Sequence, residues 1–343
     1  MSTKASGHID DSVGGGDDRD HAFDGTRAAE AACAVEMTVD FGGAYDLPRT
    51  LFPLQRGYAD PSIRVDRPEG AAGPGAVGSG AWMAFSIDAG PVLVRLDQTS
   101  PSEVRVRIWA RHDAAAQEAA DRAPILLGMH DEWEPFETML DHGEDQISAS
   151  LAQVRRRHPG VRLPATGQLF DQLVTATLEQ KVTHEQARHG WRTLLRRYGE
   201  RPPGPAPDWM RLPVPASRLR LVPSWEWHAM WVQPPSAKTI QRLAEREAAV
   251  RRLGAGTDLG TEAVNALAQR LQAIPGIGPW TAAEALQRSH GAADLPAVGD
   301  FHLAHLVGEA LTGRRTDDAG MLRLLEPWEG HRQRAIRLIK LSG

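Results

Sequence analysis

Two patterns of apolar and polar positions divide the chain. Between residue 39 and about residue 110, short apolar segments with partial two-residue alternation are separated by turn-forming clusters rich in Gly, Pro and Ser. This pattern predicts strands of an antiparallel sheet at Gly80–Ile87, Pro91–Leu96 and Val104–Trp109. From about Ile147 onward, apolar residues recur at helical spacing and no strand is predicted.

The helical pattern predicts several helices that end at glycines and prolines. A first run from Phe170 ends at Gly199, before the proline-rich stretch 201–209. Further helices are expected at Ala237–Leu253, Thr261–Ala273, Thr281–Ser289, His302–Leu311 and His331–Leu341. Residues 1–38 are poor in apolar side chains and rich in Gly and Asp, which predicts a disordered tail. The predicted fold class is α+β, with a β-rich N-terminal domain (39–146) followed by an all-α domain (147–343).

The charges are distributed unevenly between these two parts. Among the 343 residues the net charge is only -5. Residues 1–149 carry 12 basic and 26 acidic residues, however, while residues 150–343 carry 27 basic and 18 acidic residues. The N-terminal domain is therefore acidic, and a polyanion would bind to the C-terminal part. A solvated arginine-rich surface explains the same asymmetry equally well.

Cysteine and hydrophobic content exclude several classes of protein. The single cysteine, Cys33, allows no intrachain disulfide, no cysteine-based zinc site and no iron–sulfur cluster with four cysteine ligands. The thirteen histidines show no metal-ligand spacing. No apolar run reaches the length of a membrane span, and the acidic, glycine-rich N-terminus is not a signal peptide. We therefore expect a cytoplasmic protein.

The most informative stretch is LQAIPGIGPWTAAEALQRSHGAADLPAVGDFHL, residues 271–303. Gly276 and Gly278 lie between two helical patterns, where they permit a tight turn with exposed amides. Such amides, next to the N-terminus of a helix, can bind a phosphate closely because no Cβ stands in the way. Two glycines alone are more typical of a structural corner between helices than of a phosphate site.

The rest of this stretch resembles the helix-hairpin-helix/Gly-Pro-Asp superfamily of DNA glycosylases. The resemblance rests on Leu-x-x-Ile-Pro-Gly-Ile-Gly-x-Trp-Thr-Ala, followed 22 residues after Gly278 by an aspartate in Val-Gly-Asp-Phe-His-Leu. It is greatest with the bacterial alkylation-repair branch, 3-methyladenine DNA glycosylase II. Leu163–Thr183 resembles the first helices of that family, and Leu325–Ile339 its closing helix. The likeness covers about 160–343, and the N-terminal domain fits in outline.

The resemblance implies that Asp300 is the catalytic carboxylate. A fixed negative charge stabilises the oxocarbenium-like transition state in which a base leaves its deoxyribose. Asp300 could also simply cap the helix that begins after it. Trp280 is expected against the base pocket, or else in the core. Bifunctional relatives have at this position a lysine that forms a Schiff base, so Trp280 implies an enzyme without lyase activity.

Two further positions depart from the family pattern. Gln180 and Lys181 follow the first long helix, where the family inserts a wedge residue into the DNA. Lys181 stands where an apolar or amide side chain is usual, so it is either the wedge or an ordinary surface charge. Glu284 shares a helix face with Trp280 at a pocket position that is usually aromatic. An acid there could attract a cationic alkylated purine, indicate another substrate or block the pocket.

The resemblance also implies a set of DNA contacts and a cation site. The residues expected to bind DNA are Gln180, Lys181, Gly276, Ile277, Gly278 and Thr281. The backbone carbonyls of Gln272, Ile274 and Ile277 would bind a monovalent cation, and no other cofactor is implied. Trp225, Trp227 and Trp231 are expected in the helical core rather than in a base-stacking platform.

Three functions remain open at this point. The first is a monofunctional glycosylase that flips alkylated purines, of the 3-methyladenine type, out of duplex DNA and releases them for base-excision repair. It would act as a monomer in the cytoplasm, bound to the nucleoid through DNA. The second is a helix-hairpin-helix DNA-binding protein that has lost base excision. The third, an acidic interaction protein with a purely structural helical part, fits the charge asymmetry poorly.

Overall fold

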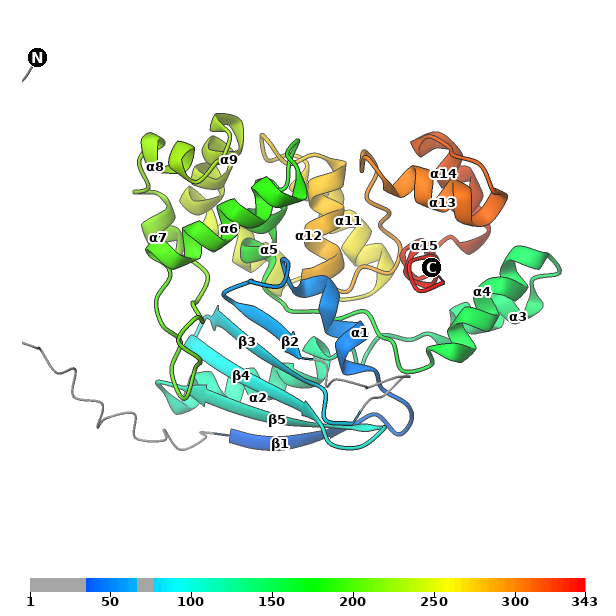
Figure 1. Ribbon diagram of the computed structural model, residues 1–343, viewed down its shortest axis with the longest axis horizontal. Helices are drawn as coiled ribbons and strands as arrows, with labels where there is room; N and C mark the ends of the chain where they lie inside the picture. The colour runs from blue at the N-terminus through cyan, green and yellow to red at the C-terminus, as the bar shows by residue number, and fades with distance from the viewer. Residues whose placement is uncertain (1–34, 67–76, 343) are drawn as a thin grey trace, which may run out of the picture.

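A five-stranded antiparallel sheet forms the N-terminal part of the computed structural model, which describes residues 35–66 and 77–342 (Figure 1). The strands are β1 (Val35–Asp40), β2 (Ile63–Asp66), β3 (Gly80–Ile87), β4 (Gly90–Gln98) and β5 (Glu103–Ala110). Their order in the sheet is β1-β5-β4-β3-β2, and every neighbouring pair is antiparallel. The predicted antiparallel sheet, and with it the α+β fold class, is confirmed.

The start of β1 corrects one expectation. The strand begins at Val35, inside segment 1–38, which was expected to be a disordered tail. Met37 lies opposite Val106 of β5, and Val39 is buried. For residues 35–38 the prediction was wrong: Val35, Met37 and Val39 do alternate with polar residues, but three such positions are too few to mark a short strand at the end of a segment rich in Gly and Asp. Residues 1–34, including Cys33, lie outside the described residues.

The two faces of the sheet are covered by different parts of the chain. Helix α2 (Asp113–Leu126) packs on one face, where its alanines allow it to lie close to β1, β4 and β5. On the other face, Trp82 and Trp109 pack against Met210 and Leu212, which belong to the helical part. The sheet is therefore joined to the helices through a shared apolar layer.

The remaining helices fall into one short N-terminal helix and a large C-terminal assembly. They are α1 (Leu47–Leu51), α3 (Glu134–His142), α4 (Gln146–Arg157), α5 (Leu169–Leu178), α6 (His184–Tyr198), α7 (Ala216–Leu219), α8 (Ser224–Ala229), α9 (Pro234–Glu245), α10 (Glu247–Ala255), α11 (Thr261–Leu271), α12 (Pro279–Ser289), α13 (Leu303–Thr312), α14 (Asp318–Leu325) and α15 (Arg332–Ile339). Two 3-10 turns, Phe52–Leu54 and Glu326–Trp328, complete the elements. Between residues 147 and 342 there is no strand, as predicted, and residues 111–146, which were assigned to the β-rich domain, contain α2 and α3 and no strand.

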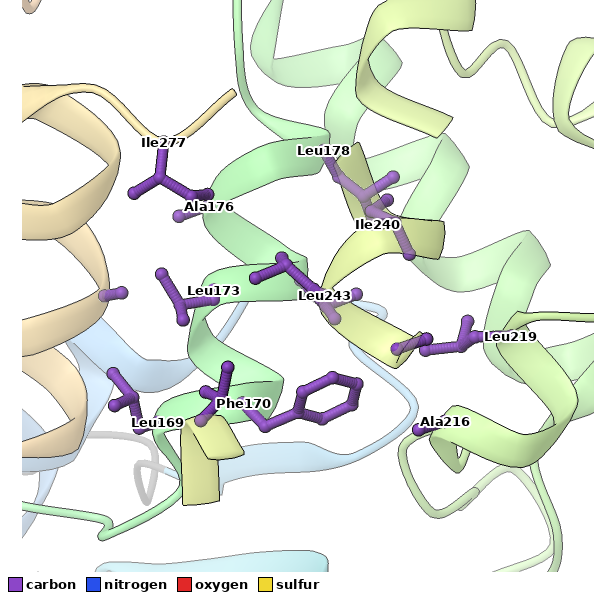
Figure 2. Close-up of a cluster of buried hydrophobic side chains, with 14 of the residues drawn as sticks. Leu169, Phe170, Leu173, Ala176, Leu178, Ala216, Leu219, Ile240, Leu243 and Ile277 are labelled. Atoms are coloured by element: carbon purple, nitrogen blue, oxygen red, sulfur yellow. The ribbon is translucent and has the colours of Figure 1, made fainter. Parts of the chain in front are cut away.

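Helix α5 is the centre of the helical part. Every residue of α5 is buried, as expected of a helix that is surrounded on all sides. It packs against α9, α10 and α12, and Figure 2 shows Ala176 next to Ile277 of the hairpin, with Leu243 of α9 on the other side of α5. The C-terminal end of α5 is thereby held next to the hairpin between α11 and α12.

A second apolar cluster joins α15, the C-terminal helix, to the N-terminal end of α12. It includes Leu303 of α13 and Ile336 and Ile339 of α15, and Trp280 packs against it. This cluster places α15 next to the segment that carries Trp280 and Asp300.

The predicted helices are present in the structure, but not all of them are continuous. The expected helix Ala237–Leu253 is two helices, because the chain leaves helical conformation at Arg246, with φ -112° and ψ 13°. Helices α1, α2, α4, α7, α8 and α14 were not predicted. No helix in the described part of the chain is long and apolar enough to cross a membrane.

Candidate active site

The hairpin is formed by α11, the turn 272–278 and α12, and its two glycines serve different purposes. Gly276 adopts a positive φ of 99°, and a Cβ there would collide with the Thr239 side chain on α9. At Gly278, no atom beyond the chain neighbours lies within 4 Å of where a Cβ would be. Gly276 is therefore required by packing inside the protein, whereas Gly278 leaves open space at the N-terminus of α12.

Gln180 connects this hairpin to the turn that follows α5. Its side-chain amide donates to the carbonyl oxygen of Gly276 at 2.8 Å and to Oγ1 of Thr281 at 2.7 Å. The Thr281 side chain is buried, as is that of Ile277. These residues were expected to bind DNA, but the side chains of Thr281 and Ile277 face the protein. They can support the DNA-binding surface only by holding the hairpin and through their backbone.

Lys181 lies at the tip of the same turn. Its side chain is exposed, and its φ of 53° places it in the left-handed region that few residues other than Gly, Asn and Asp adopt. Within the described residues it forms no ion pair. An exposed, strained residue next to the hairpin fits the wedge position expected from the sequence.

Asp300 is held at the start of α13 by backbone and side-chain donors. Its Oδ1 accepts hydrogen bonds from the amides of His302 and Leu303, both at 2.9 Å. Its Oδ2 accepts one from Nε1 of Trp280 at 3.2 Å. Asp300 therefore does cap the helix, as the simpler explanation proposed. One oxygen makes the cap, while the other faces the Trp280 indole.

These contacts keep Asp300 ionised. Burial by itself would raise the pKa of this carboxyl. The backbone and indole hydrogen bonds and the positive charge of Lys340 outweigh burial, and the pKa of Asp300 lies below its ordinary value. The carboxylate is half-buried, so its charge is only partly screened by water.

The turn with Lys181 and the loop with Asp300 are brought near each other by the segments that follow them. His184, at the start of α6, has its ring stacked toward that of His302, with 6.5 Å between the ring centroids. Phe301, between Asp300 and His302, is largely exposed, which is unusual for so large an apolar side chain. The wedge position, the hairpin and the carboxylate are thus brought to one surface.

Trp280 and Glu284 share one face of α12, but only Trp280 contacts Asp300. Glu284 instead forms an ion pair with Arg288, with Nη1 of Arg288 2.7 Å from Oε2 of Glu284. Burial would raise the pKa of Glu284, but Arg288 and other nearby cations lower it below the ordinary value. The acid that the sequence placed in the pocket is therefore already neutralised by a protein partner.

The expected cation site consists of the backbone carbonyls of Gln272, Ile274 and Ile277 in the hairpin. The carbonyl of Ile274 accepts one hydrogen bond, from the amide of Ile277 at 3.0 Å, while those of Gln272 and Ile277 accept none among the described residues. Carbonyl oxygens with free lone pairs are suitable ligands for a monovalent cation, so the residues fit such a group. The described residues contain no cluster of His, Cys, Asp and Glu side chains able to bind a metal ion.

The sequence did not identify the basic residues around Glu284. Arg288 was visible in principle, because a Glu and an Arg four residues apart on a helix are a common ion pair. Arg56, from the N-terminal domain, forms an ion pair with Glu179 at 2.7 Å. Lys340, at the end of α15, also acts on Glu284. Both come from segments far away in the sequence, and no local pattern marks them.

The tryptophan cluster differs from the expectation. Trp227 is buried, as predicted for a core residue, although its indole N–H has no partner among the described residues. Trp225 is 71% exposed, and Trp231 is 50% exposed and stacks on His189 with 3.9 Å between the ring centroids. Trp231 adopts a positive φ of 62°, which turns the chain out of the helical pattern. The prediction of a core position was therefore wrong for two of the three.

The arrangement so far defines a class of protein: an α+β chain whose helical part presents a helix-hairpin-helix corner next to an ionised, half-buried aspartate. No family model matches this sequence. No curated protein matches it either.

Solved structures extend the comparison to the whole fold. A 3-methyladenine DNA glycosylase from Archaeoglobus fulgidus superposes with a TM-score of 0.69 at 14% identity, over 89% of this chain and 97% of that one. The apo-form of an 8-oxoguanine glycosylase/lyase from Clostridium acetobutylicum gives a TM-score of 0.63 at 10% identity, over 90% and 96%. The chain therefore shares its fold with these two DNA glycosylases, as the resemblance of residues 271–303 implied.

Proposed function

We propose that this protein is a DNA N-glycosylase of base-excision repair, which hydrolyses the bond between an alkylated purine and its deoxyribose in duplex DNA. The observation that carries the proposal is the Asp300 carboxylate. It is ionised, hydrogen-bonded by Trp280 at 3.2 Å, and located on the same surface as the hairpin. The fold shared with DNA glycosylases supports the proposal.

In this proposal the hairpin and the turn after α5 hold the DNA. The open backbone at Gly278 and the N-terminus of α12 bind a phosphate without reading sequence. Lys181 enters the gap that the flipped nucleotide leaves, with its aliphatic stem among the bases and its ammonium group toward a phosphate. A monovalent cation, held by the carbonyls of Gln272, Ile274 and Ile277, would add positive charge next to that phosphate.

Asp300 then acts on the sugar of the flipped nucleotide. As the glycosidic bond breaks, positive charge develops on the sugar ring, and a fixed carboxylate lowers the energy of that state. The ionised carboxylate can also orient the attacking water. Trp280 has no amine, so no covalent bond to the sugar forms at its position, and we propose hydrolysis without strand cleavage.

Alkylated purines are the proposed lesions, with 3-methyladenine as the first to test. The motif of residues 271–303 and the similarity to a 3-methyladenine DNA glycosylase support this choice. We further propose that the chain acts as a monomer, because the hairpin, Lys181 and Asp300 all come from one copy. In the cell it would associate with the nucleoid through DNA.

The deciding experiment measures base release from methylated duplex DNA by the full chain and by Asp300→Asn. Asparagine keeps the size of the side chain and one hydrogen-bond acceptor but removes the charge, so we expect release about 10²- to 10³-fold slower. Duplex binding should be retained. If the parent protein binds duplex DNA but releases no base, the second function, a DNA-binding protein without excision, replaces this proposal. If Asp300→Asn is as fast as the parent, the assigned mechanism is wrong.

A further inference from the structure

Three side chains one helical turn apart extend from the Asp300 site toward the N-terminal domain. Trp280, Glu284 and Arg288 lie on the same face of α12. Trp280 donates to Asp300 at the outer end, and Nε of Arg288 donates to the carbonyl oxygen of Pro53 at 3.0 Å at the inner end. If the flipped base enters next to Trp280, this face is the surface that it meets.

Most of the charges along this face are paired within the protein. Glu284 and Arg288 form an ion pair at 2.7 Å, with side chains about 14% and 15% exposed. Arg56, which also acts on Glu284, is paired with Glu179 at 2.7 Å. Two positive and two negative charges thus compensate each other, and the acid at position 284 offers no free negative charge to a cationic base.

Lys340 differs from these charged residues because it has no ion-pair partner among the described residues. It directly follows α15, whose Ile336 and Ile339 belong to the apolar cluster against which Trp280 packs. Its side chain reaches solvent, and it forms no ion pair in the part of the chain that the structure describes. Ile339, directly before it, belongs to the cluster against which Trp280 packs, and Trp280 donates to Asp300, so Lys340 follows a residue of this site. Consistent with that position, its positive charge contributes to the lowered pKa of both Glu284 and Asp300.

The charge at this position matters because the base leaves with the bonding electron pair. When the bond from C1′ to the purine nitrogen breaks, the sugar becomes positive; water then adds to C1′ and gives up one proton. A purine that is cationic through ring N-alkylation leaves as a neutral molecule. An uncharged purine leaves as an anion, which takes up one proton to give the free base. A cation near the base therefore favours the second case and opposes binding in the first.

We propose that Lys340 is a specificity-determining residue of this site, which favours the release of uncharged modified purines over cationic ones. The inference rests on the proposed function and narrows its substrate class. Alkylation yields both kinds of base: 7-methylguanine is cationic in DNA, whereas the cyclic adduct 1,N6-ethenoadenine is uncharged. The uncompensated ammonium group at the end of α15 discriminates between them.

The test compares single-turnover release from two duplexes, one with a single 7-methylguanine and the other with a single 1,N6-ethenoadenine. The proteins are the full chain, Lys340→Gln and Lys340→Arg, and duplex binding is measured in parallel. For Lys340→Gln we expect ethenoadenine release to fall about tenfold relative to 7-methylguanine release, because the positive charge that favours departure of an anionic base has been removed. Lys340→Arg keeps the charge and should keep the parent's ratio. Because Lys340 is exposed, neither substitution should disturb folding. Misfolding would therefore not explain a change in the ratio of the two release rates.

The outcomes separate the two proposals. If Lys340→Gln changes both rates by the same factor, or neither rate, the role of Lys340 is wrong while the glycosylase proposal stands. If Lys340→Arg shifts the ratio as far as Lys340→Gln, the side chain acts through shape rather than charge, and the inference is also wrong. If the parent releases neither base, both proposals fail together.

Discussion

The ion pair between Arg56 and Glu179 predicts that the N-terminal domain stabilises the DNA-binding turn. Nη1 of Arg56 lies 2.7 Å and 2.8 Å from the two carboxylate oxygens of Glu179, and Nη2 donates to Thr175 at 3.1 Å. Glu179 directly precedes Gln180 and Lys181. The Arg56 side chain is only 7% exposed and that of Glu179 is 21% exposed, so the pair is largely shielded from water.

The perturbation is a double-mutant cycle with Glu179→Gln, Arg56→Met and the combination. Breaking a fully buried pair from one side costs about 3–5 kcal/mol, because the other charge is left without a counterion. Glu179 is partly exposed, and Arg56 keeps its bond to Thr175, so we expect Glu179→Gln to lower the free energy of unfolding by about 2 kcal/mol. The double variant should lose less than the sum of the single variants, with a coupling energy of about 1–2 kcal/mol.

The assay combines urea unfolding with base release from duplex DNA, using the four proteins side by side. The coupling energy comes from unfolding, and the effect on the turn comes from the release rate. We expect Glu179→Gln to slow release, since Gln180 and Lys181 follow it directly, and Arg56→Met to slow it similarly. Additive stability losses, within about 0.5 kcal/mol, would refute the idea that this ion pair joins the two parts of the molecule.

Three further predictions concern other groups. Burial raises the pKa of Asp171 from 3.8 to about 6, so its contribution to stability is fully present below pH 3.8 and lost as the pH rises through 6. Asp171→Asn should therefore stabilise the protein by up to about 3 kcal/mol at pH 8 and by less at pH 5 in urea unfolding, and a pH-independent difference would contradict this. With Trp280 at the Schiff-base position, borohydride should trap no covalent complex with DNA, and a trapped complex would show lyase chemistry. Duplex affinity should fall steeply with salt concentration, and an affinity that is independent of salt would argue against phosphate contacts by the basic half.

The elements that the sequence predicted well are those whose signals are local. Strand β3 begins and ends where the alternation predicted, and α11 and α12 begin within two residues of the expected positions. Strands β1 and β2 were missed although apolar and polar residues alternate in both, because these short edge strands have only three and two apolar positions, too few for the pattern to stand out. Short helices such as α7, with four residues, contain too few turns for a periodic pattern to appear.

The same distinction explains which parts of the site were predictable. Gly276, Trp280 and Asp300 lie within one continuous stretch, so their chemistry and spacing could be read together. Arg56 and Lys340 reach Glu284 from opposite ends of the chain, and only the tertiary structure brings them together. For this reason the sequence suggested a free acid in the pocket, whereas the structure has a paired acid and an unpaired ammonium group.

Contacts inside the protein account for part of the uneven distribution of charge between the two halves of the chain. Several arginines of the basic half are bound by the acidic half: Arg334 pairs with Asp131 at 2.5 Å, and Arg288 and Arg337 donate to the carbonyls of Pro53 and Arg49. These arginines are held inside the molecule and cannot all face a polyanion. Part of the excess positive charge therefore joins the two parts of the fold, and the DNA-binding surface must depend on fewer cations than the sequence count implies. The acidic domain thus contributes to the site by holding Arg288 and Arg337 against its backbone carbonyls, whereas Lys340 is exposed and makes no ion pair among the described residues.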